Sequence, residues 1–286
     1  YLIKNYGAKN EKFSWAIAGR DQKKLEELKK TFIEIDSQAN SIPIFVADSF
    51  HPKSLDNMTS FCKIVISTVG PYLKYGIPLI QSCVKNGTHY CDLTGEVPFI
   101  RKSIDLFDEK AKKNKCRIIH SCGFDSIPSD IGVLCLQKSS LKKFNETCDE
   151  VNLYVRSIKG GFSGGTIESI INISNYMDSN PEDSNLLKNP FALNPRNSVK
   201  NNIRQPSLKS IKWDKVNKQW ICPFLMSGIN TRVVRRTNAI TDFSYGEDFR
   251  YSEVYSFKKG VNGFFNAITM LTMLVFLKIS IKFQPL

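Results

Sequence analysis

Glycines and polar side chains follow the ends of several apolar runs in this chain. They are Gly19-Arg20, Asp48, Gly70-Pro71-Tyr72, Asp92-Leu93-Thr94-Gly95-Glu96 and Gly123-Phe124-Asp125. In an open α/β sheet, ligands bind at the carboxyl ends of the strands, near the point where the strand order reverses. These residues therefore predict a ligand-binding edge, provided that the apolar runs before them are strands of one sheet.

Arg20 and Asp48 are candidates for holding a dinucleotide. An acid at the tip of the second strand of such a domain hydrogen-bonds the ribose 2′-hydroxyl of NAD, whereas an arginine suits the 2′-phosphate of NADP. Arg20 therefore favours NADP, with NAD as the alternative, and an exposed arginine at a helix start is the structural interpretation. Asp48 either contacts adenine or caps the turn that follows it.

The other candidates lie further along the same edge. Gly70 lets the backbone approach a cofactor closely and Pro71 fixes the turn, although a plain strand exit also favours Gly-Pro. Asp92 and Glu96 could act as general acid and base, but two carboxylates at this spacing are more often helix-start caps. We therefore assign no catalytic residue from the sequence.

Alternating strands and helices must position these residues. Helical patterns separate strand-like runs at residues 13–19, 42–47, 63–69, 88–92 and 117–121. Alternation of this kind predicts an α/β fold of Rossmann type, with a doubly wound parallel sheet. The β-branched run KIVISTV (63–69) predicts a strand that is buried on both faces.

Local signals predict where the helices begin. Asp21 should cap the first helix, with Leu25, Leu28 and Phe32 as its buried stripe. A later helix should run from Pro78 to Gly87. Ser126 and Pro128 have the residue types of an N-cap and a first-turn proline.

The pattern changes near residue 149. Strands are expected at 151–158, 231–234 and 249–257, with a helix at 167–177. The glycine-rich loop 160–165 either binds an anion at the N-terminus of that helix or simply turns. We expect a Rossmann domain at 1–148, an α+β domain of substrate-binding or dimerisation type at 149–260, and an apolar segment at 261–286 that associates with a membrane or lipid.

The charge of the chain is concentrated in one segment. The formal net charge is +13, and residues 188–236 hold eleven Lys and Arg against a single acid, Asp214. Such a segment could meet an anionic membrane or a phosphorylated ligand, or it could be a solvated face. It has no DNA- or RNA-binding signature, so nucleic acid is not expected as a partner.

The cysteines and the apolar run 261–277 indicate where the protein works. The eight cysteines lack a CxxC pair, and Cys83, His89 and Cys91 lack the four-ligand spacing of a zinc site, so we expect reduced thiols and no metal. The run 261–277 carries no charge. Its length is at the lower limit for a membrane span, so we expect it to lie in a lipid interface, with a helix packed on the protein as the alternative.

Four stretches together resemble the saccharopine dehydrogenase-like oxidoreductases. They are WAIAGRDQKKLEEL, STVGPYLKYGIPLIQSCVKNGTHYCDLTGE, HSCGFDSIPSDIGV and INTRVVRRTNAI, in that order. The combination of GPYxxYG, DLTGE and GFDSIPSD is specific, and the resemblance covers nearly the whole chain, most weakly across 179–222. The family includes animal members associated with lipid droplets and bacterial trans-acting enoyl reductases of glycolipid synthesis.

The resemblance implies a Rossmann domain that opens with a GASGFTG-type loop. We therefore expect the chain to be a fragment whose first strand and glycine loop lie upstream of Tyr1, and which is inactive by itself. The resemblance places Arg20 at the NADP phosphate, Asp48 near adenine, and Val69, Gly70, Pro71 and Tyr72 along the nicotinamide half. Asp21 departs from the family, which more often has a small polar residue there, and its charge would repel a 2′-phosphate.

The functional expectation is an NAD(P)-dependent oxidoreductase. Its substrate would be a lipid or glycolipid precursor at the cytoplasmic side of a membrane or at a lipid droplet, and no secretion is expected. The alternative is an inactive Rossmann scaffold on the same surfaces. Saccharopine chemistry itself is disfavoured, because no convergent set of arginines for its carboxylates is visible. A homo-oligomer is left open.

Overall fold

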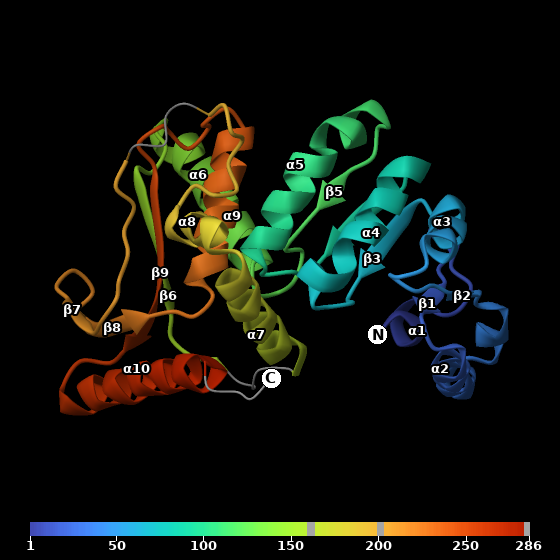
Figure 1. Ribbon diagram of the computed structural model, residues 1–286. Coiled ribbons are helices and arrows are strands. Elements are labelled where there is room, and N and C mark those ends of the chain that lie inside the picture. Colours follow the sequence, from blue (N-terminus) through green and yellow to red (C-terminus); the bar gives the residue numbers. More distant parts are fainter. Residues whose placement is uncertain (159–163, 199–202, 283–286) are drawn as a thin grey trace. The chain divides into compact units, whose positions relative to one another are not determined.

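The computed structural model describes residues 1–158, 164–198 and 203–282 (Figure 1). The chain divides into two compact units. Unit 1 contains Tyr1–Ile66, Tyr75–Tyr90 and Leu106–Ile118, and unit 2 contains Ser67–Lys74, Cys91–Asp105 and Ile119–Leu286. The expected domain boundaries at residues 148 and 260 stay a prediction.

Unit 1 begins with a short parallel pair of strands. β1 (Ile17–Gly19) pairs with β2 (Ile44–Val46), and the pair is joined by α2 (Gln22–Ile35) and the 3₁₀ turn η1 (Ser37–Ser41). The flanking helices are α1 (Leu2–Tyr6) and α3 (Pro52–Phe61). As predicted, Asp21 caps α2, accepting a 3.1 Å bond from the amide of Lys24. Leu25 is buried, but Leu28 is exposed, so the predicted stripe is only partly correct.

A second sheet carries the ligand edge. Its order is β3 (Ile64–Ser67), β4 (His89–Asp92) and β5 (Ile118–Ile119), with α4 (Tyr72–Asn86) and α5 (Val97–Lys113) as the connections. Each strand begins in unit 1 and has its carboxyl end in unit 2. Helical connections between neighbouring strands are those of a parallel α/β sheet. The predicted fold class is thereby confirmed.

Two expectations about this sheet are wrong. β3 is not buried on both faces, because Ile64 and Ile66 are 53% and 70% exposed and no described element covers them. Helix α4 begins at Tyr72, six residues before Pro78, which lies inside the helix. The earlier start is possible because side-chain oxygens of Glu96 accept the first amide protons of α4.

The rest of unit 2 is built on a four-stranded sheet with the order β6-β9-β8-β7. Its strands are β6 (Glu150–Val155), β7 (Lys212–Asp214), β8 (Gln219–Pro223) and β9 (Arg250–Phe257), and β6 pairs with β9 in parallel. Helices α6 (Ile127–Phe144) and α9 (Ser227–Ile240) pack together beside β9 (Figure 1). The core between them contains Val133, Val234, Tyr245, Phe249 and Tyr251.

The expectation of a strand at 231–234 is wrong, because these residues lie in α9. The β-branched Thr231, Val233 and Val234 favour a strand locally. In the fold Val234 is fully buried in the core beside α6, and tertiary packing of this kind overrides a weak local preference. The strand expected at 249–257 is confirmed as β9.

The remaining helices of unit 2 are α7 (Gly164–Ser179), α8 (Ser184–Lys188) and α10 (Val261–Lys282). Residues 160–163 of the predicted anion loop lie outside the described residues. Helix α10 is long and apolar enough, by length and composition alone, to cross a membrane. It also packs against β8 and β9 (Figure 1), with Ala267 fully buried and the ring of Phe264 4.8 Å from that of Trp220.

Candidate functional site

A cavity of about 540 Å³ opens at the carboxyl ends of β3, β4 and β5, and all its lining residues belong to unit 2. Small and polar residues of the strand ends form one side: Thr68, Gly70, Thr94, Gly95, Gly123 and Ser126. Apolar side chains of α7, α9 and the turn before α9 form the other: Ile170, Ile173, Leu225, Met226 and Ile229. The volume lies in the range of small-molecule sites.

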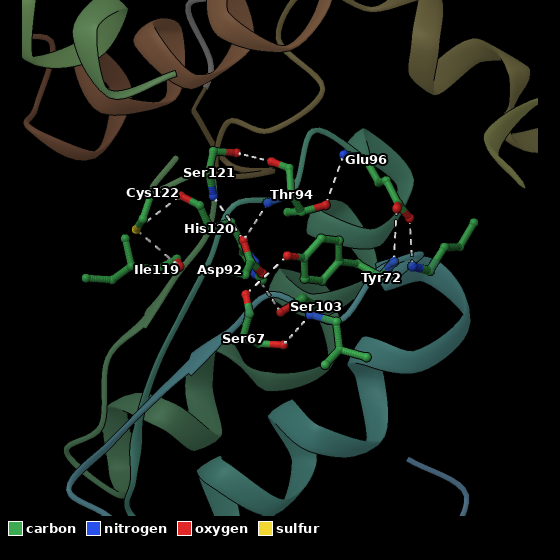
Figure 2. Close-up of polar contacts among 12 residues, drawn as sticks. Ser67, Tyr72, Asp92, Thr94, Glu96, Ser103, Ile119, His120, Ser121 and Cys122 are labelled. Atoms are coloured by element: carbon green, nitrogen blue, oxygen red, sulfur yellow. Dashed lines mark hydrogen bonds and ion pairs between the residues drawn. The ribbon is translucent and has the colours of Figure 1, made fainter. Parts of the chain in front are cut away.

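Glu96 lines this cavity and bonds both to the start of α4 (Figure 2) and to α7. Its carboxylate accepts hydrogen bonds from the amides of Tyr72 (2.9 Å) and Leu73 (2.7 Å) and from the hydroxyl of Ser169 on α7 (2.8 Å). The side chain is 1% exposed. Burial raises the pKa of Glu96, and the three hydrogen bonds oppose that rise. Glu96 thus caps α4 rather than its own helix, and each of its oxygens already accepts at least one hydrogen bond.

Asp92 organises the strand ends beside the cavity (Figure 2). It accepts bonds from the amides of Thr94 and Ser121, both at 3.1 Å, and its other oxygen lies 2.7 Å from Nδ1 of His120. His120 in turn lies 2.9 Å, through Nε2, from the hydroxyl of Ser103.

The row Asp92, His120, Ser103 has the order of groups found in hydrolase triads. Asp92 and Ser103 are each 2% exposed, and none of the three lines the cavity. We therefore assign the row to holding β4, β5 and α5 together. Glu96 is a helix cap, although of α4 and not of its own helix, whereas Asp92 caps no described helix and bonds Thr94, Ser121 and His120 instead.

The predicted adenosine-side residues lie in unit 1. Arg20 is exposed at the end of β1, and no described carboxylate lies within ion-pair distance of it. Asp48 follows β2 and accepts a 2.9 Å bond from the amide of Phe50, so it does form the turn cap that was its structural interpretation. Neither observation tests a role in binding NADP, which stays a prediction for both residues.

The other predicted residues, Val69 to Tyr72, lie in unit 2. Gly70 and Tyr72 line the cavity, and Val69 is 51% exposed. The Tyr72 hydroxyl donates a 3.1 Å hydrogen bond to the carbonyl of Ser67, and this bond fixes the position of the Tyr72 ring. The nearest atoms to a Cβ added at Gly70 would be the ring of Tyr72 and the Ser169 hydroxyl, at 3.6–3.8 Å, so packing alone does not demand glycine there.

Sequence reasoning missed a buried polar network around Asn230 of α9. Its amide oxygen accepts a 2.8 Å bond from the Ser126 hydroxyl, and its amide nitrogen donates to the carbonyl of Asp125, to Ser129 and to Glu253. Ser126 lies at the N-cap position of α6 as predicted, but its side chain bonds Asn230 instead of capping. The GFDSIPSD and INTRVVRR stretches therefore meet in the fold, which no local pattern indicates.

Comparison with known proteins assigns part of the chain to a family. Residues 3–119 match the saccharopine dehydrogenase NADP-binding domain. A candidate trans-acting enoyl reductase of Mycobacterium tuberculosis is 39% identical over 246 residues, which cover 84% of this chain and 58% of that protein. The trans-acting enoyl reductases of Mycobacterium ulcerans and Mycobacterium leprae are 36% and 35% identical, over 84% and 85% of this chain.

The chain spans about 58% of the length of the curated relatives that it matches. Within this span the similarity continues well past residue 119, since the alignments cover more than four fifths of the chain. The suspected family and its cofactor, NADP, are thereby confirmed: residues 3–119 belong to the saccharopine dehydrogenase NADP-binding domain family.

Proposed function

We propose that the natural protein is an NADP-dependent oxidoreductase and that the cavity beside Glu96 receives its substrate. The observation that carries this proposal is the position of the cavity, at the carboxyl ends of three neighbouring strands. Ligands of α/β sheets bind at this edge. The membership of residues 3–119 in an NADP-binding family supports the same edge for the cofactor.

The residues present fit the nicotinamide end of NADP. Gly70, Gly95 and Gly123 bring main chain to the cavity at three successive strand ends, so a planar ring would meet backbone rather than side chains. When bound, NADPH supplies a hydride. The chain's own part would be to orient the substrate: Glu96 fixes the start of α4 and the position of α7, and Ile170 and Ile173 keep water from that side.

A lipid or glycolipid precursor is the substrate class that the lining supports. Apolar side chains dominate the α7 and α9 side of the cavity, and apolar lining with a few polar groups is typical of sites for apolar ligands. The relatives are named as trans-acting enoyl reductases, and reduction of a conjugated double bond in such a precursor is consistent with this lining.

The test uses the natural protein at its full length. Titration with NADPH and with NADH, followed by nucleotide fluorescence, should show saturable binding with NADPH preferred. Oxidation of NADPH should then be followed against a panel of lipid enones and imines. The proposal fails if neither nucleotide binds.

A second candidate function is a Rossmann scaffold on a membrane or lipid-droplet surface without turnover. The observation that favours it is the outer face of α10, where Val261 and Phe276 are each 69% exposed and Phe265 is 59% exposed. Helices with exposed apolar side chains can lie in a lipid interface. Asn266 and Thr269 share that outer face, which weakens the case for deep insertion.

Point substitutions test the second candidate better than deletion, because Ala267 and Phe264 pack into unit 2. The double variant Phe265→Asp/Phe276→Asp should lose its association with droplets or vesicles in flotation. Val216→Asp is the matched control, since Val216 is 87% exposed on the β7–β8 turn. Unchanged flotation of the double variant would mean that α10 does not anchor the protein, whereas tight NADPH binding without turnover would favour the scaffold.

A further inference from the structure

Arginines of α5 and α9 hold one irregular segment by its main-chain carbonyls. We call residues 187–194 the carbonyl strap. Arg101 donates to Asn194 (2.9 Å), Arg235 to Pro190 (3.2 Å), and Arg236 to Leu193 (2.6 Å). Arg232 donates through Nε to Asn189 (3.1 Å) and through Nη2 to Leu187. These contacts account for three of the eleven Lys and Arg of the basic segment: Arg232, Arg235 and Arg236 bond the main chain of the fold instead of forming a solvated face.

Arg232 differs from the other three because it also lines the cavity. Its Nη1 donates to the carbonyl of Gly228 and its Nη2 to that of Leu187, and both of those residues line the cavity as well. The guanidinium is therefore held between two wall residues. The residue is 9% exposed, so little water screens its charge.

The charge of Arg232 has no counter-ion in the described part of the chain. Its three bonds go to neutral carbonyls, and no described carboxylate forms an ion pair with it, whereas Arg101 pairs with Asp105 at 2.6 Å. Burial lowers the pKa of Arg232, which reflects the cost of keeping this charge away from water. Buried charges in proteins are normally paired.

The two acids that line the same cavity, Glu96 and Asp125, form no ion pair with Arg232 in the described part of the chain. The oxygens of Glu96 already accept three hydrogen bonds at the start of α4 and on α7. Asp125 is exposed to solvent, where its field is screened. A guanidinium carries five donor hydrogens, and three bonds leave two for a ligand.

We infer that the cavity takes an amphiphilic anion: an apolar chain along Ile170, Ile173 and Ile229, and an anionic oxygen group, carboxylate or phosphate, against Arg232. This inference rests on the proposed substrate cavity and narrows its substrate class. It needs no bound nucleotide, so it can be tested apart from the redox reaction.

The experiment compares two probes that differ only in charge. Parinaric acid and its methyl ester fluoresce when they enter an apolar site, and both are titrated into the full-length protein at pH 7. The acid should bind at least about tenfold more tightly than the ester, as expected for a hydrogen bond between charged groups. Displacement by dodecanoate and by dodecyl phosphate then distinguishes a carboxylate ligand from a phosphate ligand.

Variants assign the preference to Arg232. In Arg232→Gln the preference for the acid should vanish, and in Arg232→Lys, which keeps the charge, most of it should remain. Arg236→Gln is the matched control, since Arg236 holds the same strap one turn further along α9 but does not line the cavity. It should keep the full preference.

Three outcomes overturn the inference: equal binding of acid and ester to the unmodified protein, no binding of either, or a preference that survives in Arg232→Gln. The comparison of acid and ester on the unmodified protein needs no variant. It therefore tests the inference even if Arg232→Gln does not fold. Equal binding of acid and ester would contradict the role of Arg232 but not the proposal that the cavity binds an apolar substrate. The proposal of an NADP-dependent oxidoreductase is tested separately, by the NADPH titration.

Discussion

The hydroxyl of Ser169 donates a 2.8 Å hydrogen bond to the carboxylate of Glu96, and thereby ties α7 to the start of α4. No residue of α7 is fully buried, and the helix also packs against α10. Ser169→Ala should loosen α7. Loss of a hydrogen bond to a charged group costs about 1.5–3 kcal/mol, which corresponds to roughly tenfold or faster amide exchange within α7.

Hydrogen exchange followed by mass spectrometry measures this change directly. Ser174→Ala is the control, because Ser174 lies on the same helix and the structure shows no hydrogen bond from its side chain to a described residue. Equal exchange in both variants would show that the contact with Glu96 does not hold α7 in place.

Arg20 and Asp21 should set the choice of cofactor in opposite directions. In the full-length protein, Arg20→Ala should weaken NADPH binding by about ten- to a hundredfold while leaving NADH binding nearly unchanged. Asp21→Ser should shift the preference further towards NADPH, since it removes a negative charge beside the phosphate. Serine is also a good N-cap, so it can replace the cap that Asp21 provides to Lys24. An equal loss for both nucleotides in Arg20→Ala would assign Arg20 to the fold.

Two glycines, Gly123 at the ligand edge and Gly132 within α6, should respond oppositely to alanine. A Cβ at Gly123 would lie 2.9 Å from the Cβ of Leu93, so Gly123→Ala should destabilise the fold by about 1–3 kcal/mol. Gly132, on the exposed side of α6, has nothing within 4 Å of an added Cβ. Gly132→Ala should stabilise by about 0.5–1 kcal/mol through helix propensity. Urea unfolding measures both changes in stability. If Gly123→Ala left the free energy of unfolding unchanged, the segments that carry Gly123 and Leu93 would be able to move apart without cost.

Asp130 should make stability fall as pH rises. It is partly buried, one of its oxygens has no hydrogen-bond partner among the described residues, and the other accepts a 3.0 Å bond from Thr237. Burial raises the pKa of Asp130 above its ordinary value of 3.8, although the bond from Thr237 opposes the rise. The folded chain therefore holds this proton better, and the stabilisation present below pH 3.8 is lost as pH rises through the folded pKa.

Asp130→Asn keeps an oxygen for Thr237 and removes the charge. Its Tm should exceed that of the unmodified protein at pH 7, and the gap should close as the pH falls towards 4. Asp248→Asn, at an exposed position, should show no such gap. A constant gap across this range would mean that the Asp130 side chain does not titrate differently on folding.

Local periodicity was enough to predict the alternating strands and helices of residues 13–121. The cap of α2 was predicted because Asp21 and Lys24 are neighbours in the chain. The start of α4 was not, because its cap, Glu96, lies twenty-four residues away. The prediction of a strand at 231–234 was wrong for the same reason. The contacts of Asn230 and Val234 are made with α6 and β9, which are distant in the sequence.

The candidate site shows the same limit. Gly70 and Glu96 were singled out as strand-end residues and do line the cavity. Arg232 was seen only as one charge in a basic segment, because the residues around it are contributed by α7, α9 and the strap. A site whose residues come together through long-range contacts has no periodic pattern in the sequence, so periodicity cannot predict it.

The carbonyl strap has a consequence for how this region tolerates change. Every residue has the same main-chain carbonyl oxygen. The hydrogen bonds from the arginines to the strap therefore do not depend directly on which side chains the strap carries. The exposed position Leu187 should accept many residue types with its arginine contact intact, whereas the side chain of Asn189 also accepts a 2.8 Å hydrogen bond from the amide of Phe191. Lysine at position 232 would keep the charge towards the cavity, but it lacks the planar fork that reaches several oxygens at once, so it should hold fewer carbonyls of the strap. In a saturation library across residues 187–194 and α9, most substitutions at exposed strap positions should therefore leave the protein folded. Most substitutions of the arginines that bond the strap should not.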